Sequence, residues 1–180
     1  FSPIKINIVA IKGFNDDEVL NFAQLTLERP YQVRFIELMP LGFAGMENLG
    51  KFLSNDLIKE RIGSRYELEA LDDKRKTSDG PAAMYRIRGG QGKIGFISPV
   101  SHHFCSSCNR LRLTADGHLR ACLLIDEEID LRVPIRQGCT NQDLEALLRS
   151  AVARKPAGHQ MNCEERHMKK CLKEMTSIGG

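Results

Sequence analysis

A strand–helix–strand pattern opens the chain and constrains its fold more than any other feature. Residues 4–11 are predicted to form a strand, and a helix is expected from Asn15, where Glu18 would complete a capping box. Pro30 ends this helix, and residues 31–39 form the next strand. Such βαβ units connect parallel strands, so the pattern predicts an α/β layer. One unit is too small to close a sheet, and the chain does not begin with Met. We therefore expect a piece of a longer protein.

The pattern changes in the rest of the chain. After a helix expected over residues 54–62, short strands are predicted at 66–71, 83–88, 93–98, 111–115 and 118–124. Thr140 with Asp143 predicts one more capped helix. Beyond Arg154 the chain is polar and basic, apart from a short helix expected over residues 164–173.

Composition excludes several classes of protein. The 26 Lys and Arg exceed the 23 Asp and Glu by a net charge of only +3, which is too small to indicate nucleic-acid binding. No apolar run approaches the ~18 residues of a membrane span, and no secretory signal opens the sequence, so a cytoplasmic protein is expected. In that setting the six cysteines indicate reduced thiols or metal ligands rather than disulfides.

Three of these cysteines have the spacing of metal ligands. Two residues separate Cys105 from Cys108, and Cys122 follows further along. On residue types alone, an iron–sulfur cluster and a zinc site completed by His102 or His103 are equally favoured. If the metal is a four-iron cluster, three thiolates leave one iron open to bind a substrate directly.

A predicted hairpin would bring the third thiol back to the first two. Asp116–Gly117 is typical of a two-residue type I′ turn, which needs positive φ at both central positions. This turn would pair Ala115 with His118 and place Cys122 opposite Leu111.

Arginines follow the cysteines directly. In an extended segment Arg110 and Arg112 point to the same side, with side-chain origins roughly 7 Å apart. Two guanidinium groups at that separation suit a polyphosphate, because each binds oxygens bidentately. A solvated strand face is the alternative, and the neighbouring metal-ligand pattern favours the phosphate site.

The first strand is polar on one face. Lys5 and Asn7 alternate with isoleucines, whereas a strand of a parallel sheet is normally apolar on both faces. Such a face either lines a ligand cavity inside a barrel or belongs to a solvated edge strand. Arg34 is placed similarly in the second strand. It has opposite parity to Met39, so the two share a face only if the strand bends or ends between them.

The combination of Lys-Ile-Asn, Arg-Phe-Ile-Glu-Leu-Met, Phe-Cys-x2-Cys-Asn-Arg-Leu-Arg-Leu-Thr-Ala-Asp-Gly and a terminal Gly-Gly closely resembles the MoaA-type GTP 3′,8-cyclases. These radical S-adenosylmethionine enzymes begin molybdenum cofactor biosynthesis. The resemblance runs from about Ile4 to Gly180. It implies a 4Fe–4S cluster, rather than zinc, on Cys105, Cys108 and Cys122, with an open iron that binds the guanine of GTP.

The resemblance also implies which residues bind GTP. By position, Lys5 matches a GTP-binding lysine, and Arg110, Leu111 and Arg112 match the segment that binds the triphosphate. Within that segment Leu111 can offer only its backbone or packing.

Other matched positions concern the reaction. Arg34 matches an active-site arginine, Met39 a residue that contacts S-adenosylmethionine, and Gly179 and Gly180 a C-terminal tail that reaches into the active site. Without the resemblance, such a tail would be expected to be disordered.

One departure from the family limits what this chain can do. The radical-generating cluster of the family uses an N-terminal Cys-x3-Cys-x2-Cys motif, which is absent here. The resemblance therefore implies an α/β fold in which residues 1–62 end an incomplete TIM-like (β/α) barrel. Residues 63–180 would form a small mixed α+β iron–sulfur domain. We expect this part to bind GTP but to be inactive alone.

The expected cofactors and partners follow from that division. The chain would hold one 4Fe–4S cluster, whereas a second 4Fe–4S cluster and most of S-adenosylmethionine would be bound by the missing N-terminal barrel half. GTP, S-adenosylmethionine and that barrel half are the expected partners, with a second copy of the chain as a further candidate, and without nucleic acid or a membrane. A zinc-stabilised nucleotide-binding module without redox chemistry is the alternative function.

Overall fold

The computed structural model describes residues 1–71, 80–158 and 175–178, which belong to two compact units. The first unit consists of Phe1–Met39 with Leu49–Phe104, and the second of Pro40–Asn48 with Cys105–Gly180. That residues 1–62 end a barrel and residues 63–180 form an iron–sulfur domain, as the resemblance implies, stays a prediction. Within the described ranges, no helix is both long enough and apolar enough to cross a membrane.

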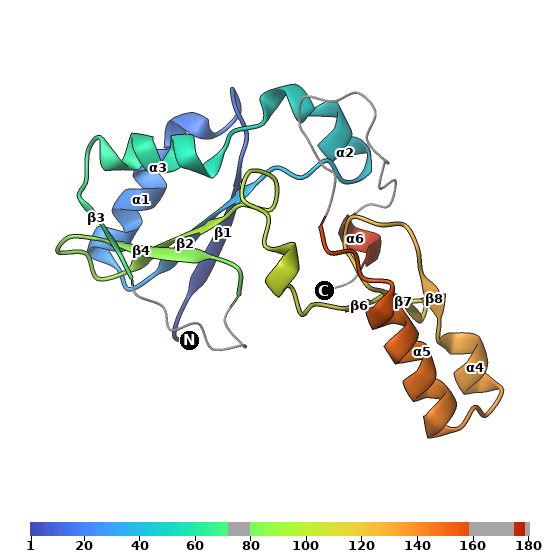
Figure 1. Ribbon diagram of the computed structural model, residues 1–180. Helices are drawn as coiled ribbons and strands as arrows, with labels where there is room; N and C mark the ends of the chain where they lie inside the picture. The colour runs from blue at the N-terminus through green and yellow to red at the C-terminus, as the bar shows by residue number, and fades with distance from the viewer. Residues whose placement is uncertain (72–79, 159–174, 179–180) are drawn as a thin grey trace. The chain divides into compact units, whose positions relative to one another are not determined.

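The first unit is built on a mixed five-stranded sheet with the order β1-β2-β5-β4-β3 (Figure 1). Its strands are β1 (Lys5–Ala10), β2 (Gln32–Glu37), β3 (Leu68–Ala70), β4 (Ala83–Ile87) and β5 (Lys93–Ile97). β1, β2 and β5 are parallel, which confirms the βαβ unit, and β3 and β4 add an antiparallel edge. The predicted α/β class is confirmed, but the sheet is mixed rather than parallel throughout.

Helices cover one face of this sheet. The 3₁₀ turns η1 (Asp16–Glu18) and η2 (Leu49–Lys51) accompany the helices α1 (Val19–Glu28) and α3 (Asn55–Gly63). α1 and α3 contact each other and β2, and they bury a core that includes Val33, Phe35 and Ile94. The alternation along β1 and β2 therefore leaves the opposite face, which carries Lys5 and Arg34, outside this core.

The predicted start of the first helix is wrong in detail. The Asn15 side chain does not cap the helix. Its Oδ1 accepts a hydrogen bond from Ile11 N at 2.8 Å, and its Nδ2 donates to Val9 O at 3.0 Å. Asparagine competes in this way for nearby backbone groups, so a 3₁₀ turn precedes α1. The helix predicted at 54–62 is confirmed, and the Ser54 hydroxyl caps it.

The second unit carries a three-stranded antiparallel sheet with the order β6-β7-β8. Its elements are α2 (Gly42–Glu47), η3 (Cys105–Ser107), β6 (Arg112–Leu113), β7 (His118–Arg120), β8 (Ile129–Asp130), α4 (Arg132–Arg136), α5 (Asn141–Ala153) and α6 (Met175–Ile178). The predicted Thr140–Asp143 capping box at the start of α5 is confirmed. Leu119, Leu131 and Ala151 form a small core.

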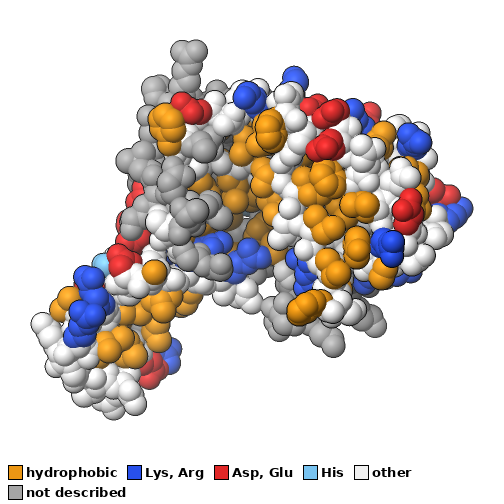
Figure 2. All heavy atoms as spheres, turned by 180° about the vertical axis from the view of Figure 1, so that it is seen from behind, with side chains coloured by type: hydrophobic (Ala, Val, Ile, Leu, Met, Phe, Trp, Pro, Cys, Tyr) orange, Lys and Arg blue, Asp and Glu red, His pale blue; other side chains and the backbone are white. Residues whose placement is uncertain are grey.

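Apolar side chains also reach the surface of this unit. Figure 2 shows hydrophobic side chains at the surface over α4 and α5. Val133, Ile135, Leu148 and Val152 are exposed there. The helix predicted at 164–173, Cys163, Cys171 and the Gly179–Gly180 tail lie outside the described residues.

The predicted type I′ turn is wrong. Among residues 1–71, 80–158 and 175–178, only glycines have positive φ. Gly117 has a φ of 85°, whereas Asp116 does not adopt that conformation. A two-residue I′ turn needs both. The strands pair Arg112 with Arg120, one residue away from the predicted register, and the ladder ends there, before Cys122.

Candidate functional site

The three cysteines with metal-ligand spacing lie in the second unit. Cys105 begins the turn η3, and Cys108 N donates a hydrogen bond to Cys105 O at 3.1 Å. Cys122 follows β7, and its Sγ accepts from Leu124 N at 3.5 Å. None of the three is in a disulfide, and all three are half-buried.

These thiols do not form an assembled metal site. Among the described residues, no three His, Cys, Asp or Glu side chains are grouped closely enough to hold a metal ion. The donor chemistry nevertheless fits an iron–sulfur cluster, because cysteines that are not in disulfides can supply the thiolates that such clusters use. That Cys105, Cys108 and Cys122 share one metal stays a prediction.

The surroundings of Cys108 favour a thiolate. Partial burial alone would raise the pKa of Cys108. A hydrogen bond from the Arg110 backbone and the positive charges of Lys155 and Arg110 together outweigh that effect, so the pKa lies below its ordinary value.

Arg112 lies within electrostatic reach of two thiols. Burial, followed by repulsion from Arg110 and Arg120, lowers the pKa of the Arg112 guanidinium. Cys108 and Cys122 act on the same pKa in the opposite direction. The arginine segment and two of the candidate ligands therefore form one electrostatic group.

Lys155 is a residue of this site that the sequence analysis did not single out. It follows α5, and its Nζ donates a hydrogen bond to Arg110 O at 2.6 Å. The end of α5 thus holds the backbone that joins Cys108 to the two arginines. A lysine in a generally basic segment gave no sequence signal of this contact.

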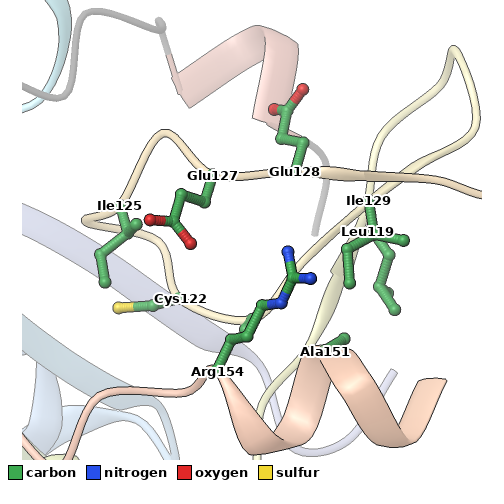
Figure 3. A pocket seen from close by; sticks show the side chains of 9 residues that line it. Leu119, Cys122, Ile125, Glu127, Glu128, Ile129, Ala151 and Arg154 are labelled. Atoms are coloured by element: carbon green, nitrogen blue, oxygen red, sulfur yellow. The ribbon is translucent and has the colours of Figure 1, made fainter. Parts of the chain in front are cut away.

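A small pocket borders Cys122 (Figure 3). Its volume is about 20 Å³, which is room for roughly one water molecule and too little for a nucleotide. Figure 3 shows the Arg154 guanidinium directed toward the loop that carries Glu127 and Glu128, while the Cys122 thiol extends away from it. This pocket is therefore not the GTP site.

The polar face predicted for the first strand is confirmed in the first unit. Lys5 and Asn7 are exposed, and Asn7 pairs with Arg34 across the parallel ladder, so the two share a face. Arg34 Nη2 donates to Gln32 Oε1 at 3.3 Å. Its buried Nε has no hydrogen-bond partner in the described part of the chain.

Glycine at position 95 makes room for Arg34. Gly95 pairs with Arg34 across β2 and β5, and a Cβ added to Gly95 would lie 3.2 Å from Arg34 Cγ. β2 ends at Glu37, before Met39. The alternation of side chains along the strand therefore does not determine whether Arg34 and Met39 lie on the same face.

A buried carboxylate anchors the segment that approaches Cys105. Glu37 is 1% exposed, and its oxygens accept hydrogen bonds from the backbone of Asn55, Val100 and Ser101. The sequence alone gave no sign of this role, because a glutamate at the end of a strand is usually solvated.

His102, the predicted fourth ligand of the zinc alternative, has a different partner in this structure. Its Nε2 lies 2.7 Å from Asp56 Oδ2. Both side chains are largely exposed.

Comparisons with known proteins agree with the motifs. A family model described as Molybdenum Cofactor Synthesis C matches residues 31–161. A protein of Moorella thermoacetica named GTP 3′,8-cyclase is 48% identical over 179 residues, which cover 99% of this chain and 53% of that protein. Proteins of the same name from Desulforamulus reducens and Listeria monocytogenes are 42% and 43% identical, again over 99% of this chain and 53% and 54% of theirs.

The chain thus spans about half the length of these curated relatives. The resemblance to the GTP 3′,8-cyclases is confirmed. Because the family model covers residues 31–161 of the 180, the chain belongs to the Molybdenum Cofactor Synthesis C family.

Proposed function

We propose that this chain is the GTP-binding C-terminal part of a GTP 3′,8-cyclase that acts in molybdenum cofactor biosynthesis. The observation that carries the proposal is the placement of Arg112 within electrostatic reach of Cys108, Cys122 and Arg110. The arginines proposed to bind phosphate and the thiols proposed to bind the metal therefore belong to one compact unit. The names of the relatives support the same activity.

Cys105, Cys108 and Cys122 would hold a 4Fe–4S cluster. When bound, the cluster supplies an iron without a protein ligand, at which the guanine of GTP can bind. The protein's own part is to keep the thiols ionised, and the charges of Lys155 and Arg110 around Cys108 act in that direction.

Arg110 and Arg112 would bind the triphosphate, with Leu111 contributing backbone or packing between them. Burial lowers the pKa of Arg112, and repulsion from Arg110 adds to that effect. An anion between the two guanidinium groups would relieve this repulsion and form bidentate hydrogen bonds. A neutral nucleoside has no phosphate groups, so it would bind to this site much more weakly than GTP.

The polar sheet face would supply further contacts. Lys5 is assigned to GTP binding. Arg34, which has a buried Nε, is assigned to the active site. Met39 is assigned to S-adenosylmethionine. Holding the nucleotide at its base and at its phosphates would orient the ribose for reaction.

The remaining assignments complete the proposal. Residues 1–62 would end a TIM-like barrel, and residues 63–180 would form the substrate domain. A separate N-terminal part would hold the radical-generating cluster and most of S-adenosylmethionine, so this chain alone would be inactive. Association of two copies is also proposed.

Metal analysis tests the cluster. After anaerobic reconstitution, the protein should be brown, with broad absorbance near ~400 nm and bound iron and sulfide. Cys122→Ser should lose most of that iron, whereas Cys139→Ser, which removes another half-buried free thiol, should retain it. A colourless protein with stoichiometric zinc would refute the cluster and favour a zinc-stabilised module.

Nucleotide binding tests the arginines in the full-length enzyme. Arg110→Ala and Arg112→Ala should each weaken GTP binding by about 1.5–3 kcal/mol, the range for hydrogen bonds to charged groups. The loss should be smaller for guanosine. Arg149→Ala is the matched control, because Arg149 is exposed on α5 and pairs with Glu145. Equal losses for GTP and guanosine would contradict the triphosphate assignment.

Gly179 and Gly180 are proposed to enter the active site as a tail, where glycine permits close backbone approach. Replacing both by Ala in the full-length enzyme should leave iron content and GTP binding near normal and severely impair cyclisation. Turnover within about twofold of the parent, equivalent to ~0.4 kcal/mol of barrier, would indicate a frayed terminus instead.

A further inference from the structure

A fully buried arginine lies two residues before Cys122. Arg120 ends β7 and has an exposed fraction of 0%. A buried guanidinium is costly unless charges and hydrogen bonds compensate it. The groups that compensate Arg120 show what this residue holds in place.

The guanidinium of Arg120 is hydrogen-bonded to the loop after Cys122. Nη1 donates to Glu128 Oε1 at 2.8 Å. Nη2 donates to Ile125 O at 2.6 Å, to Asp126 Oδ1 at 3.3 Å and to Leu123 O at 3.4 Å. One side chain therefore connects four positions of the loop to the end of β7.

We propose that Arg120 is a positioning residue that holds the Cys122 loop in the conformation in which Cys122 can bind the cluster. This inference rests on the proposed function, because it concerns how one of the three thiol ligands is presented. Arg120 itself, being buried, would not touch the cluster or GTP. It acts through the loop backbone, in the way that groups behind a metal ligand orient that ligand.

The same residue links this loop to the phosphate-binding segment. Arg120 pairs with Arg112 across the β6–β7 ladder. Its backbone thus aligns the strand that carries Arg112, while its side chain holds the loop that carries Cys122. The carboxylates of Asp126 and Glu128 offset its charge, so the cross-strand repulsion on Arg112 is reduced.

Only arginine can make this set of contacts. Its planar guanidinium presents five N–H donors in a fixed fork, whereas lysine has a single nitrogen that cannot reach opposite sides of the loop together. Arg120→Lys should therefore keep the buried positive charge but lose part of the loop contacts. Glu128→Gln and Asp126→Asn weaken the same contacts with side chains of unchanged shape.

The test uses the full-length enzyme, first without metal and then after anaerobic reconstitution. Alkylation of Cys122 by N-ethylmaleimide is followed by mass spectrometry and divided by the rate at Cys139, a free thiol outside the loop. In Arg120→Lys and Glu128→Gln this ratio should rise several-fold. Iron affinity should fall by about ten- to a hundredfold, the range for groups behind a metal ligand.

Thr140→Ala is the control for a general loss of stability. It removes the capping box of α5 in the same unit and touches none of the Arg120 contacts. Because Thr140 adjoins Cys139, the reference thiol, this control is scored by its iron content, which should stay at the parental value. If Thr140→Ala reproduces the loss of iron at equal stability, Arg120 is merely structural and the inference is overturned.

Other outcomes also decide. A parental ratio and parental iron in both Arg120→Lys and Glu128→Gln would overturn the inference. If Arg120→Lys does not fold, the isosteric Glu128→Gln and Asp126→Asn decide by the same two measurements. A parent protein that binds no iron would refute the proposed cluster, whereas the alkylation ratio of the metal-free protein would still test the role of Arg120.

Discussion

The buried Glu37 carboxylate allows a quantitative test of how the first unit is held together. Its Oε1 accepts hydrogen bonds from Asn55 N at 3.1 Å and from the Ser101 hydroxyl, and its Oε2 accepts from Val100 N at 3.0 Å and Ser101 N at 2.9 Å. Glu37→Gln replaces one accepting oxygen by an amide that can only donate. The site contains donors on both sides, so the variant cannot satisfy all of them.

The expected loss depends on which oxygen the amide replaces. If the amide takes the place of Oε1, the Ser101 hydroxyl can rotate to accept from it, and only Asn55 N is left without an acceptor. If it replaces Oε2, two backbone N–H groups lose their acceptor. A buried unsatisfied donor costs about 1–3 kcal/mol, so the better orientation still predicts a loss of about 1–3 kcal/mol. Glu37→Ala removes all three backbone contacts and should cost about 3 kcal/mol or more.

Urea unfolding of the chain, followed by circular dichroism, measures these changes in free energy. Glu69→Gln is the matched control, because Glu69 is 46% exposed and pairs with Arg88 at 2.9 Å. Loss of such a surface pair should cost less than about 1 kcal/mol. A Glu37→Gln variant within about 0.5 kcal/mol of the parent, the usual range for surface substitutions, would refute the reasoning.

Three further predictions concern single positions. Gly95→Ala places a methyl group 3.0 Å from Met84 Sδ and 3.2 Å from Arg34 Cγ, so it should cost about 1–3 kcal/mol of stability in urea unfolding. It should also displace Arg34, which is assigned to the active site, and lower the turnover of the full-length enzyme; parental turnover would contradict that assignment. The hydrogen bond from Thr114, and then the neighbouring imidazole, lower the pKa of Asp116 from 3.8 to about 2, so its stabilisation is complete above pH 3.8 and is lost as the pH falls through 2. Asp116→Asn should therefore be less stable than the parent at neutral pH and approach it in acid, and a pH-independent difference in urea unfolding would contradict this. Thr140→Ala should lower stability by about 1 kcal/mol, and no change would show that the cap of α5 is dispensable.

Predictions that depended on neighbours in sequence were mostly correct. Thr140 caps its helix as predicted, because the donor that it satisfies lies within one turn, and the helix predicted at 54–62 is present. The alternation of Lys5 and Asn7 with isoleucines gave the exposed face of β1 correctly, because side chains of a strand alternate between its faces. The capping box predicted at Asn15 was wrong, because the Asn15 side chain hydrogen-bonds to the backbone of Val9 and Ile11, which precede the helix.

Errors in the second unit also have a local physical cause. The sequence Asp-Gly is compatible with more than one turn, and only the backbone conformation of Asp116 decides which register follows. A shift of one residue changed the cross-strand partner of Arg120 to Arg112. The prediction that brought Cys122 opposite Leu111 therefore failed with the turn on which it was built.

The amino-acid sequence by itself determined most of the local elements and the family, since helix caps, strand alternation and the cysteine–arginine block all consist of residues close together in the sequence. Only the tertiary structure decided which charged side chains are buried. Glu37 meets Val100 and Ser101 from a distant part of the chain, and Arg120 is enclosed by a loop that folds back over it. Burial of a charge depends on partners brought together by folding, and residue type alone predicts that both side chains remain in water.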